Sequence, residues 1–321
     1  MQDTIEVLVK SVSHEATGIN AWELRRPDGG ELPPFTAGSH ISLHLGNGMV
    51  RSYSLCNSQS ERNRYVVAVN RDMASRGGSR FVHESLRAGD AIRVSLPRNN
   101  FPLVEDASHV VFIAGGIGIT PLYSMIQRLE TLGRSWELHY SARVREMCAF
   151  LEPLRALEER VSGRVHLNFD REPGGTMTDL GAVIASAPVS AHLYCCGPNA
   201  MLTAFEEAAA ALGRPPAQVH VEYFTAHEEA ATSGGFKVVL ARRNQSIEVQ
   251  AGQTILDTLL DHQIDVPFSC RQGVCGACET RVLKGIPDHR DSLLSPDEKA
   301  ANNTMMICCS GSKSAELVLD I

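Results

Sequence analysis

Four cysteines near the C-terminus have a spacing that suits an iron–sulfur cluster. Cys270, Cys275 and Cys278 form a C-x4-C-x2-C pattern, and Cys308 follows after a gap of 29 residues, 279 to 307. This spacing is typical of thiolates that hold a plant-type [2Fe–2S] cluster, which carries one electron at a time. Zinc is the alternative, because C-x2-C also suits zinc, but C-x4-C is a poor zinc spacing. We therefore predict that these four cysteines are the metal ligands and that the rest of the chain supplies the electron.

The loop that holds the first three cysteines also contains Gly273 and Gly276. Glycine tolerates backbone angles that other residues avoid, so the loop can wrap a cluster and aim amide N–H groups at its sulfurs. The fourth ligand is ambiguous, because Cys309 follows Cys308 directly. We expect residues 305–309 to form a buried strand, in which neighbouring side chains point to opposite faces. Only one of the two cysteines can then face the cluster, and the 29-residue gap favours Cys308.

Two glycine-containing turns are candidates for binding a nucleotide. Gly115-Gly116-Ile117-Gly118-Ile119-Thr120-Pro121 follows an apolar segment, and Cys196-Gly197-Pro198 follows a second one. Glycine lets the backbone approach a pyrophosphate, and a following helix aims N–H groups at the anion. Thr120 suits the N-cap of that helix and Pro121 its first turn. The third glycine of G-x-G-x-x-G is missing, so one turn alone is equally compatible with a structural loop. Two such turns belong together at the carboxyl edge of a parallel sheet.

A third pattern suits a flavin. Arg51-Ser52-Tyr53-Ser54 reads as a strand, in which Arg51 and Tyr53 share one face and could cover an aromatic cofactor and meet its phosphate. Arg76-Gly77-Gly78-Ser79-Arg80 precedes a short helix near 80–86 and could cradle that phosphate. Taken singly, each segment is equally compatible with an exposed strand or a flexible loop.

These motifs lie in three blocks of different character. Residues 1–103 alternate short β-rich runs with Gly/Pro breaks, which predicts a small antiparallel β-barrel. Residues 104–226 alternate strands and helices, which predicts a doubly wound parallel α/β sheet. A small, polar linker at 227–235 leads to an α+β ferredoxin-like (β-grasp) domain at 236–321. The expected strands are 4–11, 40–45, 50–55, 65–70, 91–96, 110–114, 136–141, 165–170, 192–196 and 219–223, and the expected helices after the first block are 121–132, 148–159, 179–187 and 200–212.

Composition excludes several classes of function. The 321 residues are 43% hydrophobic and 21% charged with a formal net charge of −7, which is ordinary for a soluble globular protein. The sequence has no Lys/Arg-rich run and no secretion signal, and its longest apolar run, 110–119, is too short to span a bilayer. With four of nine cysteines assigned, an odd five remain, which favours reduced thiols in the cytoplasm. We expect neither nucleic-acid nor membrane binding.

In combination, the motifs resemble the phthalate dioxygenase reductase branch of the ferredoxin–NADP reductase superfamily. The resemblance covers essentially the whole chain, in the order flavin barrel, nucleotide domain and ferredoxin domain. Besides the segments above, its markers are Glu222-x-Phe224, Pro287-Asp288-His289-Arg290-Asp291 and the chain end from Ser314 to Ile321.

The resemblance implies FMN, rather than FAD, and assigns residues to it. The FMN set is Arg51, Tyr53, Ser54, Val69, Arg71, Gly78, Ser79 and Arg80, with Thr120 approaching the flavin ring, and the NADH set is Gly116, Gly118, Ser141, Arg143, Cys196 and Pro198. Phe224 would stack on the isoalloxazine where nicotinamide must enter, and the expected catalytic residues are Phe224, Glu222, Thr120 and Cys196. The choice of NADH over NADPH stays open, because Arg143 and Arg145 could accept a 2′-phosphate.

The implied function is that of an NADH-dependent oxidoreductase. Electrons would pass from NADH to FMN, then to the [2Fe–2S] cluster and finally to a separate Rieske-type oxygenase, and the chain itself would be a monomer. The substrate of that partner would be aromatic or a quaternary amine. Two alternatives remain: a stand-alone NADH:acceptor reductase acting on a flavin or quinone, and a non-enzymatic iron–sulfur redox sensor.

Overall fold

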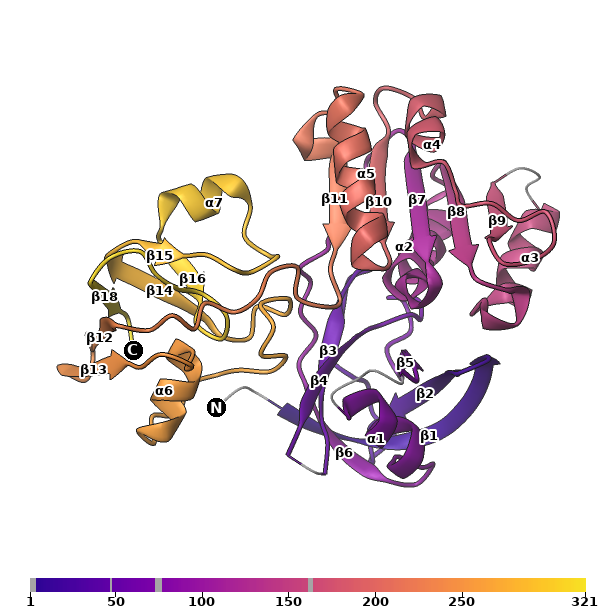
Figure 1. Cartoon of the computed structure of the whole chain (residues 1–321). Helices are drawn as coiled ribbons and strands as arrows, with labels where there is room; N and C mark the ends of the chain where they lie inside the picture. The colour runs from indigo at the N-terminus through magenta and orange to yellow at the C-terminus, as the bar shows by residue number, and fades with distance from the viewer. Residues whose placement is uncertain (1–3, 47, 73–76, 161–163) are drawn as a thin grey trace. The chain divides into compact units, whose positions relative to one another are not determined.

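A computed structural model describes residues 4–46, 48–72, 77–160 and 164–321, so Arg76 of the predicted phosphate loop lies outside the described residues. The chain divides into two units, Thr4–Glu222 and Tyr223–Ile321. The first contains an antiparallel barrel and a parallel sheet with its helices (Figure 1). The second contains the four predicted ligand cysteines.

The barrel is a six-stranded antiparallel sheet in the order β4-β3-β6-β1-β2-β5. An isolated bridge between Leu55 and Val67 links the strands at its two ends. Its core includes Trp22, Leu43 and Tyr65. The predicted barrel is confirmed, although β2 had not been predicted. Its elements are β1 (Thr4–Ala16), β2 (Ile19–Arg25), β3 (His40–His44), β4 (Val50–Ser54), β5 (Tyr65–Asn70), α1 (Gly78–Ser85) and β6 (Ala91–Ser95).

The second half of this unit is a five-stranded parallel sheet in the order β11-β10-β7-β8-β9. The strand order turns back after β9, as a doubly wound sheet requires, so the predicted class is confirmed. The elements are β7 (Val110–Gly115), α2 (Ile119–Leu132), β8 (Trp136–Ala142), α3 (Leu151–Arg160), β9 (Val165–Phe169), α4 (Leu180–Ser186), β10 (His192–Cys196), α5 (Asn199–Ala211) and β11 (Val219–Glu222).

Two helix starts differ from the prediction. A 3-10 turn at Gly116–Gly118 leads directly into α2, so Thr120 is inside the helix and is not its N-cap. The Thr120 hydroxyl instead donates to the Ile117 carbonyl at 3.0 Å. The helix predicted to start at Cys148 begins at Leu151, because Phe150 has a left-handed backbone with φ of 58°.

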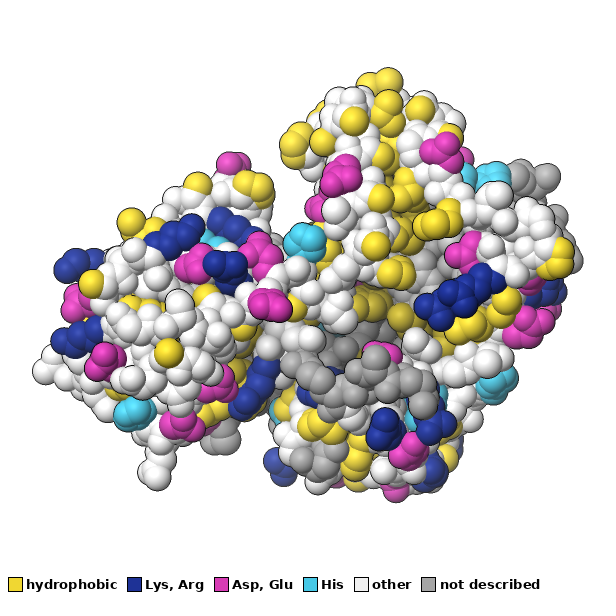
Figure 2. Space-filling model, in the orientation of Figure 1, with side chains coloured by type: hydrophobic (Ala, Val, Ile, Leu, Met, Phe, Trp, Pro, Cys, Tyr) yellow, Lys and Arg dark blue, Asp and Glu magenta, His cyan; other side chains and the backbone are white. Residues whose placement is uncertain are grey.

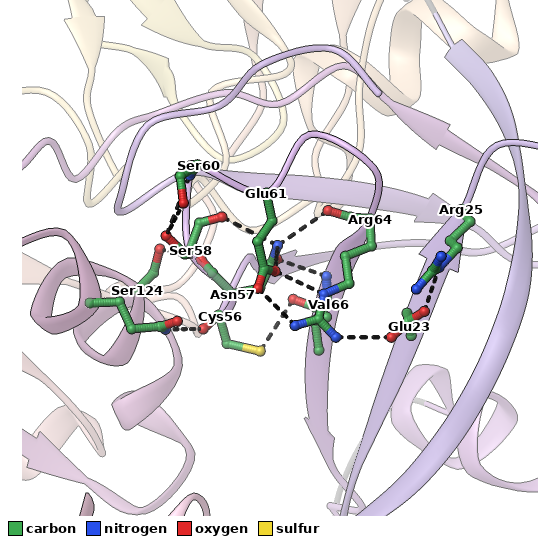
Figure 3. Close-up of polar contacts among 11 residues, drawn as sticks. Glu23, Arg25, Cys56, Asn57, Ser58, Ser60, Glu61, Arg64, Val66 and Ser124 are labelled. Carbon is green, nitrogen blue, oxygen red and sulfur yellow. Dashed lines mark hydrogen bonds and ion pairs between the residues drawn. The ribbon is translucent and has the colours of Figure 1, made fainter. Parts of the chain in front are cut away.

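A polar network joins the barrel to helix α2 (Figure 3). The Ser124 hydroxyl of α2 donates to the Asn57 carbonyl at 2.9 Å, and the Asn57 side chain donates to Glu61 and accepts from the Val66 amide, both at 2.9 Å. Arg64 pairs with Glu61 at 2.8 Å and also reaches Glu23 at 3.0 Å. The loop after β4 therefore fixes the barrel against the helix that follows the first glycine turn.

The second unit has a five-stranded sheet in the order β13-β12-β18-β14-β16 and a separate pair, β15-β17. Helix α6 starts at a capping box between Thr254 and Asp257, and α7 starts at one between Ser295 and Glu298. This mixture of sheet and short helices confirms the α+β prediction. The elements are β12 (Phe236–Leu240), β13 (Gln245–Val249), α6 (Ile255–Asp261), β14 (Glu279–Lys284), β15 (Pro287–Asp288), α7 (Pro296–Ala301), β16 (Thr304–Met306), β17 (Gly311–Ser312) and β18 (Glu316–Leu319).

The predicted linker has no helix or strand, but its second half is attached to the cluster-bearing unit. The Ala231 amide donates to the Cys309 carbonyl at 2.7 Å, and the Thr232 carbonyl accepts from the Gly252 amide at 2.8 Å. Residues 231 and 232 therefore belong with the second unit.

Figure 2 shows acidic and basic side chains interspersed on the face that is drawn, in agreement with the absence of a Lys/Arg-rich run in the sequence. Within the part of the chain that the structure describes, no helix has the length and apolar character needed to cross a bilayer.

Candidate cofactor sites

Arg51 and Gly78, from the two segments predicted to meet a flavin phosphate, are in contact. A Cβ atom on Gly78 would lie 2.5 Å from Arg51 Nε and 2.7 Å from Arg51 Cγ, so a larger residue there would have to displace the Arg51 side chain. Gly78 starts α1, whose N-cap residue Gly77 has a φ of 92°, and among the described residues no side chain hydrogen-bonds to this cap position. The first turn of a helix presents amide N–H groups, and beside them lies a guanidinium. The donor set at this point therefore fits a phosphate.

The other predicted flavin residues surround this point on β4, β5 and α1. Tyr53 shares strand β4 with Arg51, and burial raises the pKa of Tyr53 to about 12. Val69 is buried in β5, and its carbonyl contacts the His83 ring at 2.8 Å. Arg71 pairs with Glu84 of α1 at 2.6 Å.

Ser79 and Arg80 lie in the first turn of α1, and the Ser79 hydroxyl accepts from the Asp72 amide at 3.3 Å. Of the predicted flavin residues, Arg51 and Gly78 are thus in direct contact, whereas Val69 and Arg71 contact His83 and Glu84 near the other end of α1.

The two glycine turns touch at the carboxyl edge of the parallel sheet. Strands β7 and β10 are neighbours, with Ala114 opposite Cys196. A Cβ atom on Gly118 would lie 2.1 Å from the Cys196 carbonyl oxygen, and one on Gly115 would lie 2.8 Å from Pro198 Cδ. Both glycines are therefore required for close packing of the turns, as predicted for a nucleotide edge.

The remaining predicted nucleotide residues lie along the same edge. Gly116 has a φ of 55°, and Pro198 immediately precedes α5. Ser141 lies opposite Gly115 at the end of β8, and its hydroxyl is 2.7 Å from that of Thr178, a residue that sequence reasoning missed.

Arg143 and Arg145, the two arginines that could accept the 2′-phosphate of NADPH, both follow β8. Arg143 is exposed there. The guanidinium of Arg145 lies 4.6 Å from the centre of the Phe169 ring.

Glu222 connects the flavin strand to the nucleotide edge. The Ser54 hydroxyl donates to Glu222 Oε2 at 3.5 Å, and Glu222 lies opposite Cys196 in the sheet. Burial raises the pKa of Glu222 to about 8, against the opposing effect of the Ser54 hydrogen bond. Burial, and then the Glu222 carboxyl, raise the pKa of the Cys196 thiol. At neutral pH this junction therefore holds a carboxyl and a thiol that keep their protons.

The four predicted ligand cysteines are buried within the second unit. Amide groups point at their sulfurs as expected: the Cys270 amide donates to Cys275 Sγ at 3.4 Å, and the Gln272 amide to Cys270 Sγ at 3.3 Å. Gly273 and Gly276 have φ of 68° and 71°. The thiol of Cys308, and then burial, raise the pKa of Cys278. Four thiols gathered in this way can all ionise only around cations, so the donor set fits an iron–sulfur cluster.

The strand predicted over residues 305–309 is wrong. Strand β16 ends at Met306, and residues 307–309 form a turn, so strand alternation cannot decide between the two cysteines. The sulfur contacts do separate them. Cys308 neighbours Cys270 and Cys278, whereas Cys309 Sγ lies 3.7 Å from the Met306 carbonyl and beneath Gly273. Phe224, the predicted gate, lies in the unit that begins at Tyr223, so its stacking stays a prediction.

A flavin-type barrel, a nucleotide-binding sheet and a four-cysteine unit in one chain define a nicotinamide-dependent flavin and iron–sulfur reductase. Comparison with family models agrees: residues 112–207 match an oxidoreductase NAD-binding domain and residues 238–312 match a 2Fe-2S iron-sulfur cluster binding domain.

Relatives match over nearly the whole chain. Phenoxybenzoate dioxygenase subunit beta of Ectopseudomonas oleovorans is 53% identical over 99% of this chain and 97% of its own. Tetrachlorobenzoquinone reductase of Sphingobium chlorophenolicum is 51% identical over 99% of this chain and 98% of its own length. The chain therefore belongs to the phthalate dioxygenase reductase branch of the ferredoxin–NADP reductase superfamily.

Solved structures support the same assignment. The structure of phthalate dioxygenase reductase is 40% identical, with a TM-score of 0.74 over 99% of this chain and 98% of that one. An intact type IV self-sufficient cytochrome P450 monooxygenase is 38% identical with a TM-score of 0.88, and this chain spans 41% of its length.

Family membership makes the chain an oxidoreductase whose cofactors are NADH, FMN and a [2Fe–2S] cluster. It belongs to the class of reductases that supply electrons to oxygenases.

Proposed function

We propose that this chain is a monomer that passes electrons from NADH to a Rieske-type oxygenase acting on an aromatic acid. Support comes from two relatives whose names contain aromatic acids, phenoxybenzoate and phthalate, each named with a dioxygenase. The observation that carries the proposal is the junction at Glu222, where the flavin strand and the nucleotide edge meet in one unit.

The residue roles that we propose rest on the family resemblance and on the positions of the side chains. Arg51 and the first turn of α1, with Gly78, Ser79 and Arg80, hold the FMN phosphate. Tyr53, Ser54, Val69 and Arg71 would border the ring system when FMN is bound, and Thr120 would approach it. The turns at Gly116, Gly118 and Pro198, with Ser141 and Arg143, orient the coenzyme.

The chemistry at the reacting ring is supplied by the cofactor. When bound, FMN accepts a hydride and gives up electrons singly, which is what a one-electron cluster requires. The protein sets the protonation state beside it: Glu222 holds a proton at its carboxyl oxygen, and Ser54 orients that carboxyl. The neutral Cys196 thiol keeps charge away from the nicotinamide position.

Three further assignments complete the proposal. Phe224 covers the isoalloxazine until nicotinamide enters. Cys270, Cys275, Cys278 and Cys308 hold the cluster. The working domains are residues 1–103, 104–226 and 236–321, with the segment 227–235 between the last two; its residues 231 and 232 hydrogen-bond to the cluster-bearing unit.

The test is reconstitution with candidate oxygenases. The purified chain, NADH and a Rieske-type oxygenase for an aromatic acid should give hydroxylated product, with no product when the chain is left out. Because a relative of similar architecture is part of a P450 monooxygenase, a P450 haem protein serves as the competing acceptor. Faster electron delivery to the haem protein than to the Rieske oxygenase would contradict the proposal.

A second candidate function is reduction of a quinone. It is favoured by the relative at 51% identity that is named as a tetrachlorobenzoquinone reductase. Steady-state kinetics with a halogenated benzoquinone distinguish the two. A variant that lacks the cluster should lose oxygenase support and keep quinone reduction if the quinone takes electrons directly from the flavin.

A further inference from the structure

Three side chains that could bind a metal gather on one face of the parallel sheet, in the unit that does not contain the four ligand cysteines. Glu137 and His139 lie two residues apart on β8, and His166 lies on β9 directly opposite His139. Side chains two apart on a strand share a face, so all three project from the same surface, while Leu138 and Tyr140 are buried on the other. The arrangement joins two strands and leaves His166 exposed.

The distances suit a divalent cation. The ligand atoms of the three side chains all lie within 4.8 Å of one another, and His139 Nε2 is 3.4 Å from Glu137 Oε1. Ligands at about 2.0–2.1 Å from a tetrahedral metal are roughly 3.4 Å apart, so this pair already has the required separation. The two imidazole rings are stacked, with centres 4.5 Å apart and 21° between their planes.

The two side chains on β8 are partly buried. The side chains of Glu137 and His139 are only 25% and 19% exposed, so both are held in place by the sheet. A carboxylate with two imidazoles is a donor set for borderline metals such as zinc, whereas magnesium and calcium prefer oxygen ligands.

We propose that Glu137, His139 and His166 form a second metal site, selective for zinc and similar divalent transition ions, with an open fourth position for water. Ser141, which lies at the coenzyme edge, is the next residue after His139 on this face of β8. The proposal does not depend on the function proposed above, because it needs only these three side chains.

The test uses the holoprotein and zinc alone. After equilibrium dialysis, zinc and iron are counted per chain, and a chromophoric chelator in competition gives the affinity. We expect one zinc per chain in addition to the cluster iron. His166→Ala and Glu137→Gln should each weaken zinc binding at least about tenfold, because even indirect support of a metal ligand contributes that much. His14→Ala, at an exposed histidine on β1, is the matched control and should leave affinity unchanged.

His166 is exposed, so its replacement should fold, and unchanged NADH-dependent ferricyanide reduction would verify this. X-ray absorption at the zinc edge should show nitrogen and oxygen neighbours. Zinc bound through sulfur would overturn the assignment. So would equal affinity in His166→Ala, Glu137→Gln and the wild type, or no bound zinc in the wild type.

Discussion

Cys308 and Cys309 are adjacent in the chain, but their sulfur atoms have different neighbours. Cys308 lies with Cys270 and Cys278, whereas Cys309 packs beneath Gly273. Cys308→Ser should therefore abolish the visible absorption of the [2Fe–2S] cluster, and Cys309→Ser should leave it. The measurement is the absorption spectrum with iron content per chain. The reverse result, with the cluster lost only in Cys309→Ser, would reassign the fourth ligand.

Arg51 is expected to bind the anionic end of the flavin. Arg51→Ala removes a charge-assisted hydrogen bond worth roughly 1.5–3 kcal/mol, so flavin affinity should fall by about ten- to a hundredfold. Fluorescence titration of the apoprotein with FMN measures this. Arg93→Ala, at an exposed arginine on β6, is the control and should bind FMN normally. Equal affinity in both variants would show that Arg51 does not contact the cofactor.

Glu222 should make stability depend on pH. Its pKa is raised from 4.5 to about 8 in the folded chain, so the unfolded chain loses this proton first as pH rises. Burial of this carboxyl therefore leaves the free energy of unfolding unchanged below about pH 4.5, and it lowers that free energy increasingly as the pH rises to about 8. At about pH 9, the Glu222→Gln variant, which cannot ionise, should have a free energy of unfolding roughly 2–4 kcal/mol above that of the wild type. It should therefore also unfold at a higher temperature.

At about pH 5 the difference between Glu222→Gln and the wild type should nearly vanish. Thermal unfolding of both proteins across this range provides the check. A difference that is constant with pH, or largest in acid, would mean that the carboxyl is ionised in the folded protein.

At the scale of elements, the loop after β4 decides how the barrel meets helix α2. Asn57 is 5% exposed and forms hydrogen bonds both with the barrel residues Glu61 and Val66 and with Ser124 of α2. Asn57→Ala leaves the Val66 amide without its partner, at a cost of about 1–3 kcal/mol. We expect a lower melting temperature and a raised KM for NADH, because α2 follows the glycine turn of the coenzyme edge. Ser58→Ala, which loses only exposed hydroxyl contacts, is the control. Identical behaviour of the two variants would show that the joint is unimportant.

Most elements could be predicted because their sequences are locally consistent. The apolar run ending in Gly115-Gly116 and the pattern Cys196-Gly197-Pro198 each predict a strand followed by a turn, and the structure has both strands. Topology then brings the turns together, since the carboxyl ends of parallel strands share one edge.

Other features depend on contacts that local sequence does not contain. Whether residues 307–309 continue β16 depends on how the fourth ligand loop returns to the cluster loop, so the predicted strand was too long. The start of α2 moved because a 3-10 turn took up Gly116–Gly118. The bond between Ser54 and Glu222 joins residues 168 positions apart, and the contact between His139 and His166 spans two strands. Only the fold makes these pairs visible.

At the scale of the molecule, the two units divide the proposed work. The unit Thr4–Glu222 contains both the flavin and the coenzyme motifs, and the cysteines lie in Tyr223–Ile321. The contacts of Ala231 and Thr232 stay within the second unit, so a cut near Ala226 leaves them intact. Hydride uptake should then be separable from single-electron delivery.

The most direct test compares the whole chain with a fragment that ends at Ala226. The fragment should keep FMN and reduce ferricyanide with NADH at nearly the rate of the whole chain, because both motifs end before the cut. It should reduce cytochrome c poorly and should fail to support an oxygenase, because both need the cluster. A fragment that drives the oxygenase at the full rate would place the cluster outside the electron path and contradict the account.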